Sequence, residues 1–413
     1  MKFTEYGVEY LSKKLAKKRL RVLKRYQYYE MKNNIEKIGN MIPKSYKSLS
    51  ETLGWCAKAV DSLADRIVFD SFRNDNFGLN EIYRLNNSDI LFDSAVLSAL
   101  ISSCSFIYIS ANNGYPELQV IDGGNATGII DTTTNMLTEG YAVLERDEYG
   151  KAVLEAYFRP YITEYYINGV IDNKLTFHHK SPFSLLVPII NRPDAKRPFG
   201  HSRISRACMN LTQSALRTLL RSEVSAEFYS VPQKYILGLD EEAAEFNNRA
   251  ATLSSFLNFG RDDNGNIPSL GQFQQQSMTP HLEQLRTIAS VFAGETGLTL
   301  DDLGFTSSNP SSSEAIRASH ENLRLSARKS QRTFGTGFVN AGFLAACIRD
   351  NFEYDRRAFA DIRAEWLPVF EPDSAALTGI ADAILKINQA VPGFMNPRNI
   401  RLLTGLESAS DDV

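Results

Sequence analysis

The sequence is poor in the residues on which most catalytic and metal sites depend. It has five histidines and four cysteines in 413 residues, and the cysteines stand singly at Cys56, Cys104, Cys208 and Cys347. Without close cysteine pairs, the pattern excludes a zinc knuckle and the disulfide framework of a small secreted domain. We therefore expect four small core thiols and no metal site.

Motifs of nucleotide and hydrolase chemistry are also missing. There is no Gly-x-x-x-x-Gly-Lys-Ser/Thr phosphate loop and no Gly-x-Ser-x-Gly elbow. His178 and His179 are adjacent in a predicted strand, so their rings point to opposite faces and cannot share a metal ion. We expect no cofactor and no enzymatic activity, and an enzyme of unknown class is the least favoured alternative.

Charge of one sign and long apolar runs are absent as well. The formal net charge is −3, so any contact with nucleic acid has to rest on local patches. No run of about 18 uncharged apolar residues is long enough to cross a bilayer. The first residues run from Met1 into basic positions without the apolar core of a secretory signal. We expect a soluble protein made in the cytoplasm.

The first 70 residues favour helices. Residues 10–37 have helical composition, and eight basic residues with no acidic one lie between Lys13 and Arg25. Two interpretations stay open for them: a face that meets phosphate or a partner, or a solvated face of an outer helix. Residues 50–67 carry apolar residues at helical spacing and predict a buried packing helix.

Strand patterns dominate between about residues 105 and 190. Runs such as Phe106–Ile109 and Tyr141–Leu144 are separated by turn residues. Asn168-Gly169, between two short apolar runs, is typical of a two-residue type I′ hairpin. These patterns predict an antiparallel β region.

Beyond residue 200 the pattern returns to helix. A helix of roughly 25 to 30 residues is predicted from a cap at Ser202 to the residues before Pro232, where proline stops it. Residues 231–276 predict a compact mixed insert that includes a strand at Lys234–Leu237. A helix at His281–Ala293 then leads into Thr299–Ser313, whose Ser, Asn, Gly and Asp content predicts an exposed loop.

The last 100 residues predict mostly helix. A long basic helix should start at Ser312 or Ser313, with a possible kink at Gly335 and Gly337. A small helical unit follows at residues 374–406. With 413 residues the chain exceeds one ordinary core, so we expect an α+β protein of two or three regions.

Two local motifs and their order along nearly the whole chain resemble those of a known family. Pro198-Phe199-Gly200-His201-Ser202-Arg203-Ile204 opens a long helix, and Ser311-Ser312-Ser313-Glu314-Ala315-Ile316 joins a polar loop to another. This arrangement is similar to that of the portal proteins of tailed bacteriophages, of the siphophage head-to-tail connector type.

The resemblance implies a division of the chain into the parts of a portal subunit. It implies two stem helices that flank a small α/β clip, a tunnel loop, a long kinked wing helix and a small helical crown. The implied bounds are 1–200 for the N-terminal wing, 201–230 for the first stem helix, 231–276 for the clip, 277–298 for the second stem helix, 299–312 for the tunnel loop, 313–350 for the wing helix and 351–413 for the wing end and crown.

The resemblance also implies a function and its residues. Family members form a ring of about a dozen subunits at one capsid vertex of the virion, through which DNA is packaged and ejected. The implied partners are other copies of the chain, double-stranded DNA, the terminase large subunit, a head-tail adaptor, and the major capsid and scaffolding proteins, with no membrane. Another phage head-tail structural or adaptor protein is the alternative.

Individual residues take their implied roles from position. The tunnel-loop residues that would line the DNA channel are Phe305, Thr306, Ser307, Ser308 and Asn309. Arg317 and Arg324 would be basic residues of the channel or of an intersubunit contact. Glu241 and Glu242, in the clip, would dock the packaging motor or adaptor.

Overall fold

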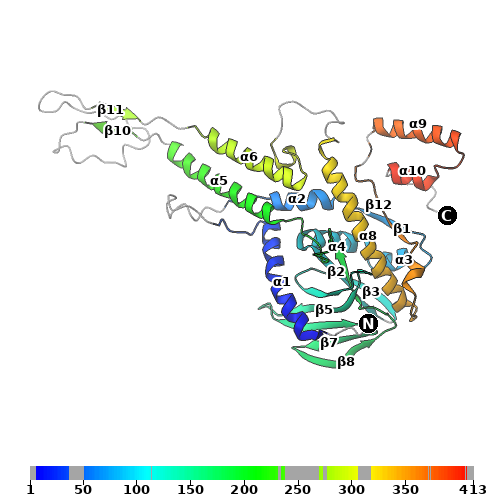
Figure 1. Cartoon of the computed structure of the whole chain (residues 1–413). Helices are drawn as coiled ribbons and strands as arrows, with labels where there is room; N and C mark the ends of the chain where they lie inside the picture. The colour runs from blue at the N-terminus through cyan, green and yellow to red at the C-terminus, as the bar shows by residue number, and fades with distance from the viewer. Residues whose placement is uncertain are drawn as a thin grey trace, which may run out of the picture. The chain divides into compact units, whose positions relative to one another are not determined.

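The chain forms two compact units. The computed structural model describes residues 6–36, 51–112, 114–230, 234–237, 269–272, 277–305, 318–370, 372, 374–404 and 406 (Figure 1). The larger unit comprises Met1–Asn33, Gly54–Met209 and Gly294–Val413, and the smaller comprises Asn34–Leu53 and Asn210–Ala293. Both helices and strands are abundant, which confirms the α+β class.

The larger unit contains most of the regular elements. Its helices are α1 (Gly7–Tyr29), α2 (Trp55–Ala64), α3 (Leu79–Leu85), α4 (Ser88–Ser102), η3 (Asp301–Leu303), α8 (Glu321–Arg349), η4 (Arg356–Phe359), α9 (Ser374–Ala390) and α10 (Pro397–Thr404). Its strands are β1 (Phe69–Arg73), β2 (Cys104–Asn112), β3 (Tyr115–Ile121), β4 (Ala126–Ile130), β5 (Leu137–Arg146), β6 (Ala152–Arg159), β7 (Ile162–Ile167), β8 (Val170–His178), β9 (Leu186–Ile190) and β12 (Arg363–Trp366). No helix in the described ranges is both long and apolar enough to cross a membrane.

Three antiparallel sheets organise these strands. A five-stranded meander runs β4-β5-β6-β7-β8, a three-stranded sheet has the order β3-β2-β9, and β1 pairs with β12. The antiparallel prediction for residues 105–190 is therefore confirmed. At the β7–β8 turn, Asn168 and Gly169 have φ of 50° and 81°, the two positive values that a type I′ hairpin requires.

Helix α1 packs on the meander and is held there by polar contacts. Leu11 and Leu15 share a buried cluster with Tyr141, Val143 and Tyr157 of the sheet. The helix ends at Tyr29, short of the predicted Lys37. The carboxylate of Glu139, on β5, accepts hydrogen bonds from the backbone N–H groups of Tyr6 and Gly7 at 3.0 and 3.1 Å. A distant carboxylate thus satisfies donors that the start of a helix leaves free.

The basic residues of α1 divide between two faces. Lys14 and Lys18 donate to the carbonyls of Gly128 and Ala126, and Arg25 donates to Ser102. Lys14 and Lys18 also lie over the ring of Phe199 at 5.3 and 5.6 Å. The solvated-face interpretation therefore holds only for the outer positions, since these three cations bind the body of their own unit.

An aromatic cluster ties β1, α3, α4 and α8 together. Phe92 stacks on Phe69 with ring centroids 3.8 Å apart and meets Phe338 at 4.5 Å. The buried hydroxyl of Tyr83 donates to the carbonyl of Phe338 at 2.7 Å. Burial raises the pKa of Tyr83 well above its ordinary value. This cluster makes α8 part of the core.

The glycines of α8 are close-packing positions. The helix continues from Glu321 to Arg349 through Gly335 and Gly337, so the proposed kink does not interrupt it. A Cβ at Gly337 would lie 2.7 Å from the Ile189 side chain, and one at Gly342 would lie 2.6 Å from Leu79. These glycines let β9 and α3 approach the helix closely. All four cysteines are free and buried, which confirms their predicted core role.

The smaller unit contains most of α5 (Arg206–Ser230), the β10 (Lys234–Leu237) and β11 (Ser269–Gln272) hairpin, and most of α6 (Thr279–Thr296). The strand predicted at residues 234–237 is confirmed, and β10 pairs antiparallel with β11. Ser225 of α5 and His281 of α6 lie within hydrogen-bond distance, 3.3 Å. The predicted cap at Ser202 is wrong: Ser205 accepts from the backbone N–H of Cys208 at 3.1 Å and caps α5.

Candidate functional site

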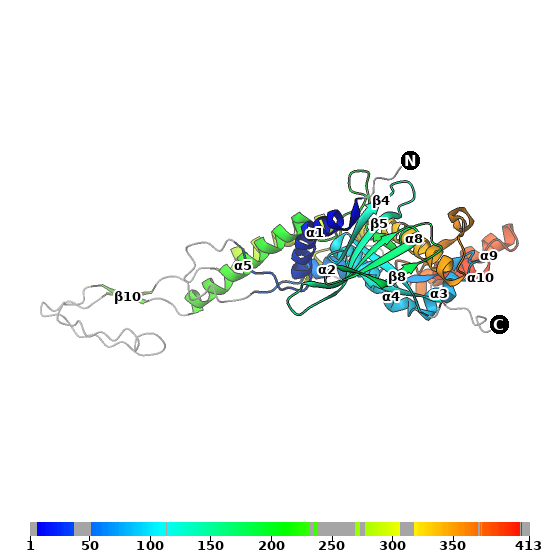
Figure 2. The same ribbon diagram turned by 90° about the horizontal axis from the view of Figure 1, so that it is seen from below.

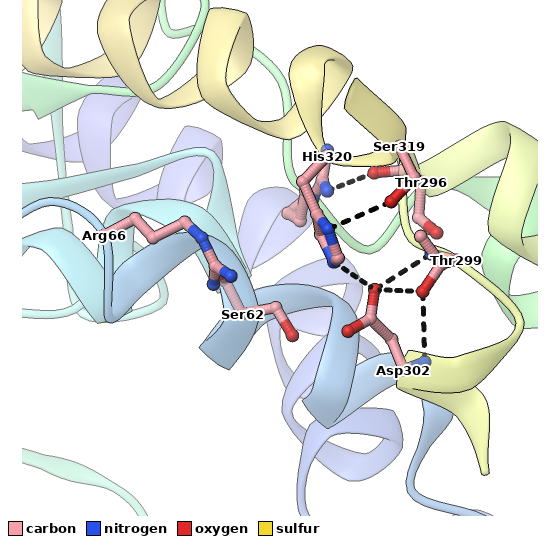
Figure 3. A network of polar contacts seen from close by, with 8 residues as sticks. Ser62, Arg66, Thr296, Thr299, Asp302, Ser319 and His320 are labelled. Atoms are coloured by element: carbon pink, nitrogen blue, oxygen red, sulfur yellow. Dashed lines mark hydrogen bonds and ion pairs between the residues drawn. The ribbon is translucent and has the colours of Figure 1, made fainter. Parts of the chain in front are cut away.

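The polar segment predicted as a tunnel loop is fastened at both ends by one carboxylate (Figure 3). Asp302 Oδ2 accepts hydrogen bonds from the backbone N–H and the hydroxyl of Thr299, each at 2.9 Å. The same oxygen lies 3.1 Å from His320 Nε2, just before α8 begins. We call Thr299, Asp302 and His320 the loop anchor. It brings together residues that are 18 positions apart in the sequence.

The environment of the loop anchor favours an ionised Asp302. Burial alone would raise its pKa, but the hydrogen bonds from Thr299 and the contact with His320 outweigh burial and lower it. The side chains of His320 and Asp302 are only 12% and 21% exposed, so water screens their attraction less than at an open surface. The His320 ring also meets Phe370 at 6.3 Å.

Of the five residues expected to line the DNA channel, Phe305 is the one inside the described ranges. Its backbone N–H donates to the carbonyl of Leu300 at 3.0 Å. Its ring meets the edge of Trp55, on α2, with centroids 6.5 Å apart. Phe305 is therefore half-buried and packs against α2.

Arg203, within the first recognised motif, is a buried junction between helices. Its guanidinium donates to the carbonyl of Ala59 on α2 at 3.1 Å and to that of Thr296 at the end of α6. Burial lowers the pKa of Arg203 to about 10. Ser202 donates to the carbonyl of Ile101 at 2.6 Å, at the end of α4. The motif thus binds carbonyls at the ends of α4 and α6 and one carbonyl within α2, just before α5 starts.

Arg324 pairs within its own helix. Its guanidinium makes two hydrogen bonds to the carboxylate of Glu321, at 2.7 and 2.5 Å. These bonds raise the pKa of Arg324 and lower that of Glu321. Exposed pairs of this kind contribute little to stability. Arg324 was expected to contact DNA or a neighbouring subunit, and in this structure its guanidinium is paired with Glu321.

A groove with a basic rim lies farther along α8. It has a volume of about 530 Å³ and is bounded by α8, η4 and β12. Four arginines line it, Arg328, Arg332, Arg356 and Arg363, and no carboxylate does. In the described part of the chain, no group of three or more His, Cys, Asp or Glu side chains could hold a metal ion.

The other predicted site residues fall outside the described ranges. They are Thr306, Ser307, Ser308, Asn309, Arg317, Glu241 and Glu242. Sequence reasoning missed the loop anchor and the structural role of Arg203, although both carried a signal. Asp302 and His320 bracket the polar segment, and Arg203 stands inside the recognised motif.

Comparison with known proteins identifies relatives by sequence. No protein-family model matches the chain. The chain is 25% identical over 338 residues to the portal protein of Mycobacterium phage L5, covering 76% of this chain and 68% of the relative. It is 27% identical over 346 residues to the portal protein of Mycobacterium phage D29, covering 77% and 69%.

Solved structures that match the chain come from gene transfer agent particles. A chain of the virion of a native particle matches with a TM-score of 0.48 and 15% identity, over 94% of this chain and 93% of that one. A chain of the neck of the native particle, computed with C12 symmetry, matches with a TM-score of 0.46 and 16% identity, over 86% and 90%. By sequence, the chain is similar to the portal proteins of these two mycobacteriophages.

Proposed function

We propose that the chain is one subunit of a phage portal, a ring of about a dozen copies at one capsid vertex that serves as the conduit for DNA packaging and ejection. The observation that carries this proposal is the relation to two phage portal proteins over three quarters of the chain. The role is structural and not catalytic, and it places the protein in the virion.

We assign segments of the chain to the parts of a portal subunit by the order of the elements along the chain. In this assignment α5 and α6 are the stem helices, and the β10–β11 hairpin belongs to the clip at 231–276. Residues 1–200 and α8 build the wing, and α9 with α10 belongs to the wing end and crown. The loop anchor supports a tunnel loop at 299–312, because a polar segment fastened at both ends can project into a channel while its base stays fixed.

We propose weak contacts with DNA and local contacts with partner proteins. A chain with net charge −3 suits a conduit, because many phosphate contacts would hold moving DNA in place. Thr306, Ser307, Ser308 and Asn309 would meet DNA through hydroxyls, amides and backbone. Arg317 would be a channel or intersubunit cation, and Glu241 with Glu242 would dock the terminase large subunit or the head-tail adaptor. Major capsid and scaffolding proteins would surround the ring.

The deciding experiment is the mass of the purified full chain in solution. Light scattering should give a mass of about twelve times 46.3 kDa, and negative-stain images should show a ring with a central hole. A compact dimer, or a globular monomer that stays single after co-expression with its scaffolding protein, would contradict the portal assignment.

A further inference from the structure

The arginine groove on α8, formed by Arg328, Arg332, Arg356 and Arg363, has an apolar floor. Its lining includes Val339 and Phe343 of α8, Phe359 of η4 and Ile362. The volume of about 530 Å³ is within the range of pockets that hold small ligands. It can therefore admit the side chains of a protein partner.

Two of the four arginines have guanidinium groups without a hydrogen-bond or ion-pair partner among the described residues. Arg356 donates to Asn340 at 3.1 Å, and Arg363 donates to the carbonyl of Ala360 at 2.6 Å. Arg328 and Arg332 are exposed, and their guanidinium groups make no hydrogen bond or ion pair in the described part of the chain. The groove therefore combines a hydrophobic floor with uncompensated positive charge, which fits an acidic partner with an apolar centre.

The same unit carries an exposed surface with the opposite charge. Asp89 and Asp93 lie one turn apart on the outer face of α4, and Ile90 beside them is 74% exposed. Asp65, after α2, faces the same region, since burial and then the charges of Asp89 and Asp65 raise the pKa of Asp93. No cation opposes that effect on Asp93. We call Asp65, Asp89, Ile90 and Asp93 the acidic ridge.

Ile90 of the acidic ridge points away from α8. Phe92 of α4 packs against Phe338 of α8 at 4.5 Å, and Ile90 lies two residues, about 200°, from Phe92 around the helix. Figure 2 shows α8 with α3 and α4 beside it, and none of the four residues of the acidic ridge lines the arginine groove. One copy of the chain cannot bring its own ridge to its own groove.

We propose that the arginine groove of one copy receives the acidic ridge of the next copy. The occupant is thus a second copy of this chain, with Ile90 over the apolar floor and the aspartates opposite Arg328 and Arg332. Because groove and ridge are different surfaces of one subunit, the contact is head-to-tail, the type that generates rings when the rotation closes. This inference rests on the proposed function and identifies the surfaces through which its ring would form.

The test is a charge swap across the contact. The double variant R328E/R332E reverses the groove, and D89R/D93R reverses the ridge. Each alone should lose rings and elute as monomer, because like charges would then face each other. Mixed together, the two variants should form rings again, since each reversed surface meets a complementary one at every contact. The quadruple variant should form rings by itself.

A matched control separates this effect from general loss of charge. Lys329→Glu changes an exposed cation beside Arg328 that does not line the groove, and rings should persist. Thermal unfolding of the double variants should match the parent chain, which shows that they fold.

Three outcomes would overturn the inference. Rings from both double variants would place the interface elsewhere and leave the proposed function standing. Rings from R328E/R332E with weaker binding of double-stranded DNA would make the groove a DNA surface. If the parent chain never assembled into rings, both the proposed function and this contact would be contradicted.

Discussion

A single buried imidazole gives the larger unit a pH-sensitive point. His179 is 7% exposed, and its Nδ1 accepts a hydrogen bond from the backbone N–H of Ser181 at 3.2 Å. Among the described residues, its Nε2 has no hydrogen-bond partner. Burial, together with the charge of His178, lowers the pKa of His179 to about 4. The folded chain therefore holds this ring neutral, whereas the unfolded chain protonates it below a pKa of about 6.5.

We predict that stability falls as the pH drops from about 6.5 towards 4. The unfolded state binds the proton first, so the stabilisation that is complete above pH 6.5 is lost progressively until the folded pKa is reached. A shift of the His179 pKa from about 6.5 to about 4 corresponds to a loss of up to about 3 kcal/mol in the free energy of unfolding. Urea unfolding at pH 7.5 and 5.0 measures the difference, and His179→Phe should reduce it.

The neighbouring His178 provides the control, because it is exposed at the end of β8. His178→Asn should keep most of the pH dependence, because burial is the larger cause of the lowered pKa of His179 and the charge of His178 is the smaller one. An equal loss of stability between pH 7.5 and 5.0 in the His179→Phe variant would contradict the assignment.

Among the elements, the described ends of the segment from Thr299 to His320 are held together by one side chain. Asp302 joins its two ends, and its lowered pKa means that the folded state favours the carboxylate. This contribution is complete above the unfolded carboxyl pKa of about 3.9 and is lost as the pH falls through the lower folded value. At neutral pH the anchor is fully formed.

We predict that Asp302→Asn loosens both ends of this segment. Hydrogen bonds to a charged, partly buried group contribute about 1.5 to 3 kcal/mol each, and the amide cannot replace the charge beside His320. Amide exchange of residues 299–305 and 318–322 should become faster by roughly tenfold or more, as local opening becomes easier.

Asp361→Asn is the matched control, since Asp361 is exposed and contributes only its backbone carbonyl to a hydrogen bond, from Asn74. Exchange at the anchor should not change in this variant. Unchanged exchange in Asp302→Asn would mean that packing, such as that of Phe305 on Trp55, holds the ends instead.

At the scale of the whole molecule, different parts of the chain would serve ring assembly and the passage of DNA. The groove and ridge that would close the ring lie on α8 and α4, whereas the proposed tunnel loop leaves the core beyond Phe305. Shortening the loop should therefore affect transport of DNA and leave the contacts between copies unchanged.

We predict that deletion of Thr306–Asn309 leaves rings intact and stops DNA packaging. Phe305 is kept because its ring packs against Trp55, so the base of the segment retains its contacts. Ring mass by light scattering and DNA protected inside capsids that carry the variant are the two measurements. Normal packaging, or loss of rings, would contradict the tunnel-loop assignment.

Local patterns in the sequence were sufficient for most elements. The hairpin at Asn168-Gly169, the strand at 234–237 and the helices around 10–29 and 206–230 depend on residue preferences and periodicity over a few positions, which neighbours along the chain decide. The resemblance to portal proteins came from the order of such elements, and the sequence relatives support it. Helix ends were less certain, as the cap at Ser205 shows.

The sequence by itself thus determined the α+β class, the antiparallel region and the portal resemblance. Only the tertiary structure decided which distant polar groups meet: Asp302 with His320, Arg203 with Thr296, and Glu139 with the start of α1. It also decided that four arginines from three elements share one groove. Such contacts join residues far apart in the sequence, and their partners are set by how buried surfaces pack, which no local pattern encodes.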